Sequence, residues 1–191
     1  MKIYVSDNGG QWTHREWRVL KYLKVDTKII PNTTPIDEIS DIDGLVLSGG
    51  ALSTTDTINF GKTAEYLDKL NCPILGICAG IQFIASHFKG EIGPAEFPEF
   101  GKTEIYLDKE NEIFKNVPKN FFAWESHNDE IKKLPEDFIA LAHSENTKIQ
   151  AIKHDSKPIY GLQFHPEVEH TQYGLDIFKN FLEIVTEYSK K

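Results

Sequence analysis

Short apolar runs alternate with amphipathic helical patterns along the first half of the chain. The apolar runs predict buried strands over residues 3–6, 27–30, 44–47 and 73–77. Between them, apolar residues recur at helical spacing over 13–23, around 60–70 and over 81–88. Thr34 and Pro35 also predict a helix start, with Thr34 as the cap and Pro35 in the first helical position. Strands that alternate with helices are typical of crossover units and a mostly parallel sheet.

In the second half of the chain, the helical pattern fades and strands predominate. Further strands are predicted over 102–107, 121–124, 138–142, 149–153 and 159–164, most of them joined by clusters of Asp, Asn, Lys and Pro. A last helix is predicted over 173–188, with a broad apolar stripe that favours packing against the sheet. Together the patterns predict an α/β fold, a three-layer sandwich with a mixed, mostly parallel central sheet, in one domain over 1–191.

Composition narrows the class of protein. The 191 residues carry 21 Lys+Arg against 29 Asp+Glu, and this net charge of -8 argues against a nucleic-acid partner. No apolar stretch approaches the roughly 18 residues that a membrane span needs. The two cysteines make no disulfide framework and no secretory pattern precedes them, so we expect reduced thiols and a cytoplasmic location.

The strongest local motif surrounds Cys78. The segment Gly-Ile-Cys-Ala-Gly-Ile-Gln over 76–82 follows an apolar strand and precedes a helical run. This is the setting of a nucleophile elbow, with Cys in place of Ser. A helix N-terminus and a nearby imidazolium would favour the thiolate. The alternative is that Cys78 is only a small buried residue, which is the reading we prefer for Cys72 because no such motif surrounds it.

A nucleophile needs a base, and the base needs a group that orients it. His165 and Glu167 flank Pro166, and in an extended backbone residues two apart point to the same side. The Glu167 carboxylate can then reach one imidazole nitrogen while the other faces the nucleophile. The alternative for this segment is an ordinary surface turn.

A glycine turn follows the third predicted strand, and motifs for metal or phosphate binding are absent from the sequence. The Ser-Gly-Gly turn at 48–50 offers backbone N–H groups that, with the N–H of Ala79, could form an oxyanion hole, although an ordinary glycine turn reads the same. No Cys/His spacing resembles a zinc site, and no phosphate-binding loop occurs. We therefore expect no metal and no cofactor on this chain.

These motifs together resemble the class I (triad) glutamine amidotransferases, over nearly the whole chain and in the family's motif order. The resemblance narrows to the branch of the family that serves GMP synthesis. Segments 7–11, 124–129 and 160–171 carry it. In the archaeal form of that branch, the amidotransferase and an ATP pyrophosphatase are separate subunits.

The resemblance implies a reaction. Cys78 would attack the side-chain amide of glutamine, with His165 as base and acid and Glu167 as its orienter. A γ-glutamyl thioester would form and be hydrolysed to glutamate. The ammonia would pass to the ATP pyrophosphatase partner, which adenylates XMP and makes GMP. ATP and Mg²⁺ would belong to that partner, and the overall activity would be a ligase step of purine biosynthesis.

The resemblance also implies binding roles. Gly50 and Ala79 would donate backbone N–H groups to the oxyanion. Gln82, Ser126 and His127 would line the glutamine pocket.

The chain departs from the family pattern at two places. The cysteine is usually followed by Leu-Gly-His, whereas this chain has Ala79, Gly80 and Ile81, and the glycine pair is usually followed by Pro rather than Ala51. Neither change removes a reacting group, but the packing under the elbow and the rigidity of the oxyanion hole stay open. Two alternatives also remain: an amidotransferase for another acceptor, such as chorismate or a histidine-pathway intermediate, and a non-catalytic binding module with the same fold.

Overall fold

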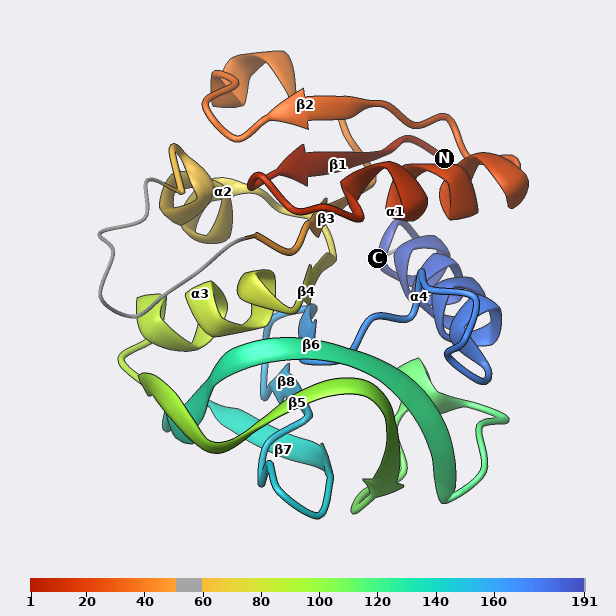
Figure 1. Cartoon of the computed structure of the whole chain (residues 1–191). Coiled ribbons are helices and arrows are strands. Elements are labelled where there is room, and N and C mark those ends of the chain that lie inside the picture. The colour runs from red at the N-terminus through yellow and green to blue at the C-terminus, as the bar shows by residue number, and fades with distance from the viewer. Residues whose placement is uncertain (51–59, 191) are drawn as a thin grey trace.

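A curled sheet of nine strands runs through residues 1–50 and 60–190, the part of the chain that the computed structural model describes (Figure 1). The strand order is β2-β1-β3-β4-β9-β8-β7-β5-β6. One half is parallel: β2 (Ile29–Pro31), β1 (Ile3–Asp7), β3 (Gly44–Leu47), β4 (Ile74–Ile77) and β9 (Ile159–Leu162). The other half is antiparallel: β8 (Ala151–His154), β7 (Phe138–His143), β5 (Glu91–Leu107) and β6 (Asn120–Lys133). The sheet is mixed, as predicted.

Helices cover both faces of the parallel half. On one face lie α1 (Thr13–Tyr22) and α4 (Gly174–Tyr188), and on the other lie α2 (Thr63–Lys69) and α3 (Ala79–His87) (Figure 1). Side chains alternate across a strand, so Ile3 and Val5 of β1 pack in the core under α1 and α4, whereas Tyr4 packs in the core under α2 and α3. The two cores on opposite faces of one sheet confirm the three-layer α/β arrangement.

The helix predicted from Thr34 and Pro35 is only a single 3₁₀ turn, η1 (Ile36–Glu38), and Thr34 does not cap it. Pro35 occupies the cap position, and the Thr34 hydroxyl donates to the Pro31 carbonyl instead. The prediction of an α-helix here was wrong because no apolar stripe follows the start signal. A second 3₁₀ turn, η2 (Glu112–Phe114), lies between β5 and β6.

The strands β5 and β6 are much longer than the predicted 102–107 and 121–124, with 17 and 14 residues. Together they form an antiparallel ribbon that arches past the rest of the sheet (Figure 1). The register shifts between Pro94 and Glu99, and Gly101 has a φ of 92°. Proline and glycine read as loop residues in a sequence, although irregular and bulged strands accommodate them. For that reason, the prolines and glycines in the first half of β5 kept it from being predicted as a strand.

No helix in the described part of the chain is long and apolar enough to cross a membrane.

Candidate active site

Cys78 lies at a sharp turn between β4 and α3 and has a φ of 52° and a ψ of -107°. A positive φ is strained for any residue with a Cβ, so the surrounding structure must hold it. The flanking glycines make the turn possible by close approach. A Cβ on Gly76 would lie 2.7 Å from the Gly80 carbonyl carbon, and a Cβ on Gly80 would lie 2.5 Å from the Leu47 oxygen. The segment therefore has the geometry of a nucleophile elbow.

Packing under the elbow accommodates the first departure from the family pattern. Ile81 is fully buried, and a Cβ on Gly161 of β9 would lie 2.4 Å from its Cγ1. The missing side chain of Gly161 thus makes the space that Ile81 fills. Ala51, the second departure, lies outside the described residues.

His165 follows β9 and faces Glu167 as the sequence predicts, with 2.6 Å between His165 Nδ1 and Glu167 Oε1. Both side chains are buried. Burial by itself lowers the pKa of His165, but the carboxylate of Glu167 and the proximity of Cys78 outweigh it and raise that pKa well above its ordinary value. The other ring nitrogen, Nε2, is buried and has no hydrogen-bond partner among the described residues. It is therefore the atom left to exchange a proton.

The nucleophile and the base meet over Gly49. A Cβ on Gly49 would lie 3.5 Å from both the Cys78 Cβ and the His165 Cε1, so the turn packs directly against these two side chains. Gly50 and Ala79 also come together, because a Cβ on Gly50 would lie 3.6 Å from that of Ala79. Both residues line the same cavity as Cys78. The predicted oxyanion donors are thus placed beside the sulfur.

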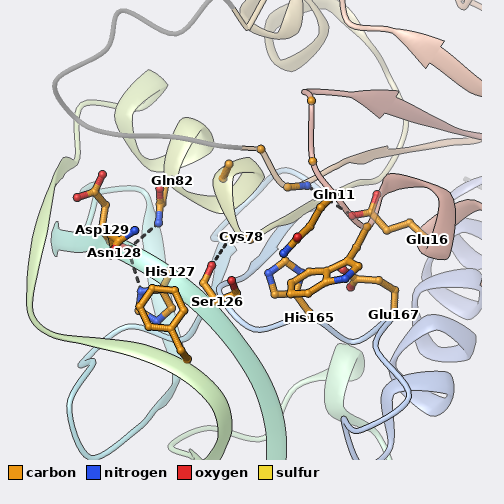
Figure 2. A pocket seen from close by; sticks show the side chains of 17 residues that line it. Gln11, Glu16, Cys78, Gln82, Ser126, His127, Asn128, Asp129, His165 and Glu167 are labelled. Carbon is orange, nitrogen blue, oxygen red and sulfur yellow. Dashed lines mark hydrogen bonds and ion pairs between the residues drawn. The ribbon is translucent and has the colours of Figure 1, made fainter.

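The cavity has a volume of about 330 Å³, which suits a ligand of amino-acid size. The elbow, the His165 loop, and Ser126 and His127 of β6 all line the cavity (Figure 2). The Cys78 thiol donates to the Ser126 carbonyl over 3.8 Å (Figure 2). Phe100 of β5, which is 61% exposed, closes part of the rim.

Two of the predicted pocket residues use their polar atoms within the protein. His127 is buried, with Nδ1 3.0 Å from the Asp129 carbonyl oxygen and Nε2 3.1 Å from Glu99 Oε2. Gln82 Nε2 donates to the same Asp129 oxygen over 2.7 Å and to Gln163 Oε1 over 3.1 Å. Gln82 can therefore meet a ligand through Oε1, whereas His127 shapes the wall from behind.

One cluster in the described part of the chain could hold a metal ion: the carboxyl groups of Glu99 and Glu125 and the imidazole of His127 lie within 4.8 Å of one another. Their contacts are those of an ion-pair network. Glu99 also accepts from the hydroxyl of Ser144 over 2.7 Å and from the amide of Gln150 over 2.8 Å. Burial acts to raise the pKa of Glu99, but these partners outweigh it and lower that pKa. Burial and the charge of Glu99 raise the pKa of Glu125 well above its ordinary value, which favours a neutral carboxyl there.

Two site residues escaped the sequence reading, and both come from the start of α1. The indole of Trp12 packs edge-on against the His165 ring, with 4.3 Å between ring centroids. Glu16 is 1% exposed, and its Oε1 accepts a long, 3.5 Å hydrogen bond from the Gly49 N–H. Burial and the charge of Glu167 raise the pKa of Glu16 well above its ordinary value. The sequence could have indicated the burial of Glu16, because it lies on the same helical stripe as the buried residues Thr13 and Leu20.

Cys72 lies away from this cavity and is buried between the end of α2 and β4. Burial, helped by the charge of Asp43, raises the pKa of its thiol to about 12. A thiol that stays protonated at neutral pH is a poor nucleophile.

Comparison with known proteins places nearly the whole chain in one family. The model of the family "Glutamine amidotransferase class-I" matches residues 4–185. The glutamine-hydrolyzing GMP synthase subunit of Thermoplasma acidophilum is 53% identical over 189 residues, which cover 98% of this chain and 94% of that protein. The protein of the same name from Methanocaldococcus jannaschii is 51% identical over 188 residues, 95% of this chain and 96% of that protein. A crystal structure described as that of a GMP synthase subunit from Thermoplasma acidophilum superposes with a TM-score of 0.95 at 52% identity, covering 100% of this chain and 96% of that one.

Proposed function

This chain belongs to the class-I glutamine amidotransferases, and from that membership we propose that it hydrolyses glutamine at Cys78 and delivers the ammonia to an ATP pyrophosphatase partner that converts XMP to GMP. One observation supports the catalytic part most directly. A cysteine held at a positive φ, a histidine with one buried unpartnered nitrogen and a glutamate paired with that histidine meet at one cavity. A binding module of the same fold has no need of all three groups.

The geometry supports the following sequence of steps. His165 Nε2 takes the thiol proton of Cys78, and Glu167 stabilises the imidazolium that results. The thiolate attacks the amide carbon of glutamine, and the backbone N–H groups of Gly50 and Ala79 stabilise the oxyanion. His165 returns the proton to the departing ammonia, which leaves a γ-glutamyl thioester on Cys78. A water activated by His165 then hydrolyses the thioester to glutamate and restores the thiol.

The acceptor part of the proposal rests on the relatives. Those that share about half of their residues with this chain are named as the glutamine-hydrolyzing subunit of GMP synthase, a name that implies a further subunit. The chain has no phosphate-binding loop of its own, so the ATP and Mg²⁺ that activate XMP would belong to the partner. The pair would then carry out a ligase reaction of purine nucleotide biosynthesis.

The same proposal includes gating by the partner. Ammonia made without an acceptor is wasted glutamine, and closure on docking can complete a catalytic arrangement. Gly9 and Gly10 line the cavity, and the exposed His170 packs at a tilt against Trp124 of β6, with 5.0 Å between ring centroids. We place the docking surface on this rim and expect the isolated chain to be a poor glutaminase.

The test is a glutaminase assay of the chain alone and with the ATP pyrophosphatase partner, ATP and XMP. We expect low activity alone and a large increase in the full mixture, with GMP formed in step with glutamate. A Cys78→Ala control should lose glutamine-dependent GMP synthesis but keep synthesis from added ammonium. Coupling to a chorismate-using or histidine-pathway synthase instead would overturn the assignment of the acceptor. Absence of labelling by a diazo-glutamine analogue would favour the non-catalytic module.

A further inference from the structure

Gln163 contacts the nucleophile but has no part in the steps above. It follows β9, two residues before His165, and its side chain is fully buried. Its amide nitrogen, Nε2, donates to Cys78 Sγ over 3.7 Å. Its backbone N–H donates to the Gln150 carbonyl over 2.8 Å, which anchors the residue to the segment before β8. A buried amide therefore points at the reacting sulfur from a fixed position.

The orientation of this amide follows from a backbone carbonyl. The Asp129 oxygen can only accept, so the Gln82 side chain must present its NH₂ group there, at 2.7 Å. The second N–H of that group then faces Gln163 at 3.1 Å, and Gln163 must answer with Oε1. This places the Gln163 NH₂ group on the side of the sulfur. The hydrogen bonds from the Asp129 carbonyl through Gln82 to Gln163 thus fix which end of each side-chain amide is oxygen and which is nitrogen.

We propose that Gln163 is a further catalytic residue, an amide donor that stabilises the Cys78 thiolate, and that Gln82 is the positioning residue that keeps this donor turned toward the sulfur. The proposal rests on the proposed function for its effect on turnover. An amide N–H does not ionise, so Gln163 transfers no proton itself and acts only by shifting the exchange between Cys78 and His165 toward the thiolate. Its contribution is differential, because a thiolate accepts a stronger hydrogen bond than a thiol or a thioester sulfur does.

This arrangement gives Gln82 a second role. Its NH₂ group serves Gln163, while the resemblance assigns Gln82 to the glutamine pocket. Gln82 lines the pocket and is 3% exposed. Glutamine that contacts its Oε1 would therefore act on the same side chain that holds the Gln163 amide against the sulfur. Occupation of the pocket and stabilisation of the thiolate would thus share one side chain.

The test measures the alkylation rate of Cys78 by iodoacetamide against pH, in a Cys72→Ala background so that one thiol reacts. Gln163→Met keeps the length of the side chain and removes the donor. We expect its rate profile to move to higher pH by about one unit, the size of effect that a hydrogen bond to a charged group produces. Gln163→Glu should move it further, because a carboxylate repels the thiolate. Glutaminase kcat/KM should fall about tenfold at neutral pH in Gln163→Met, and the loss should shrink as the pH rises.

Gln150→Met is the matched control, since it removes a buried glutamine amide that does not contact the sulfur. Its alkylation profile should match the parent. If Gln163→Met fails to fold, Gln82→Met carries the test, because it leaves Gln163 in place but frees its amide to rotate, and a smaller shift in the same direction is expected. A folded Gln163→Met or Gln82→Met protein with the parental profile would overturn the proposal. Alkylation needs neither glutamine nor a partner, so a shifted profile without any glutaminase activity would refute the proposed function and leave the role of Gln163 at the sulfur intact.

Discussion

Each half of the sheet carries a buried histidine paired with a glutamate, and only one of the two histidines has a ring nitrogen without a hydrogen-bond partner among the described residues. At the end of the parallel half, His165 Nδ1 contacts Glu167, while Nε2 finds no hydrogen-bond partner within residues 1–50 and 60–190. On the β5–β6 ribbon, His127 engages both ring nitrogens, one with the Asp129 carbonyl and one with Glu99. The same pair of residue types thus leaves one imidazole nitrogen open at the cavity in one place and engages both nitrogens in the other. What decides is whether the second nitrogen is left open.

A second carboxyl group accompanies each pair. Glu16 lies beside His165 and Glu167, and Glu125 lies beside His127 and Glu99, 3.4 Å from the imidazole. Burial raises the pKa of both additional carboxyl groups, so each favours its neutral form. Each cluster therefore holds one ion pair without accumulating negative charge in the core. This shared arrangement makes the open nitrogen of His165 the main difference between the two.

The largest expected effect tests whether Cys78 is the sulfur that His165 serves. Cys78→Ala should abolish glutaminase activity, while Cys72→Ala should leave it within about threefold, because the Cys72 thiol is protonated at neutral pH and lies outside the cavity. Glutamate release and labelling by a diazo-glutamine analogue measure both variants. Labelling of Cys72 instead would show that the elbow assignment is wrong.

A matched pair of substitutions separates the two histidine clusters. Glu167→Gln should lower kcat by about 10²-fold to 10³-fold with little change in KM, because an orienting carboxylate sets the imidazole tautomer, and the loss is smaller than the 10⁴-fold of a serine enzyme since cysteine is the stronger nucleophile. Glu99→Gln should keep kcat within about threefold but destabilise the fold by about 3 kcal/mol, because a neutral amide replaces the buried carboxylate that pairs with the imidazole of His127. Steady-state kinetics and urea unfolding read the two effects. Unchanged kcat in Glu167→Gln would end the triad interpretation.

A smaller effect should appear in the pH dependence of stability. The folded pKa of Glu125 is raised, so the folded state holds a proton that the unfolded state releases, and the stability that this proton provides is lost as the pH rises from about 4.3 toward the raised value. Glu125→Gln removes this dependence. As the pH rises across that window, the free energy of unfolding of the variant should increase relative to that of the parent by up to about 1.4 kcal/mol per pH unit. Urea titrations at pH 5 and pH 7 measure the gain, and parallel curves for the two proteins would contradict a neutral Glu125.

The smallest effect should come from the solvent-facing side of the ribbon. Phe100→Ala removes an exposed ring from the rim of the cavity and should raise the KM for glutamine a few-fold with kcat unchanged. Phe97→Ala is the control, since Phe97 is 58% exposed on the same strand but does not line the cavity. Equal kinetics for both variants would remove Phe100 from the pocket, and a lower kcat would mean that the ribbon also orders the reacting groups.

What the sequence by itself determined is local. The elbow at Cys78, the pairing of His165 with Glu167 and the glycine turn at 48–50 could all be predicted, because each depends on residues within a few positions of one another. The strands of the parallel half could be predicted for a similar reason, since burial on both faces makes them short and mostly apolar.

Only the tertiary structure decided which polar groups meet. Glu16 reaches the Gly49 N–H across 33 residues, His127 meets Glu99 across 28, and Gln163 reaches Cys78 across 85. These contacts depend on strand order, on the register of β5 against β6 and on the approach of α1 to the end of β3. The sequence shows the same residue type whether a buried glutamate or glutamine supports a strand, holds a proton or faces a thiolate. Its role is set by partners that lie far away along the chain and become neighbours only when the sheet is assembled.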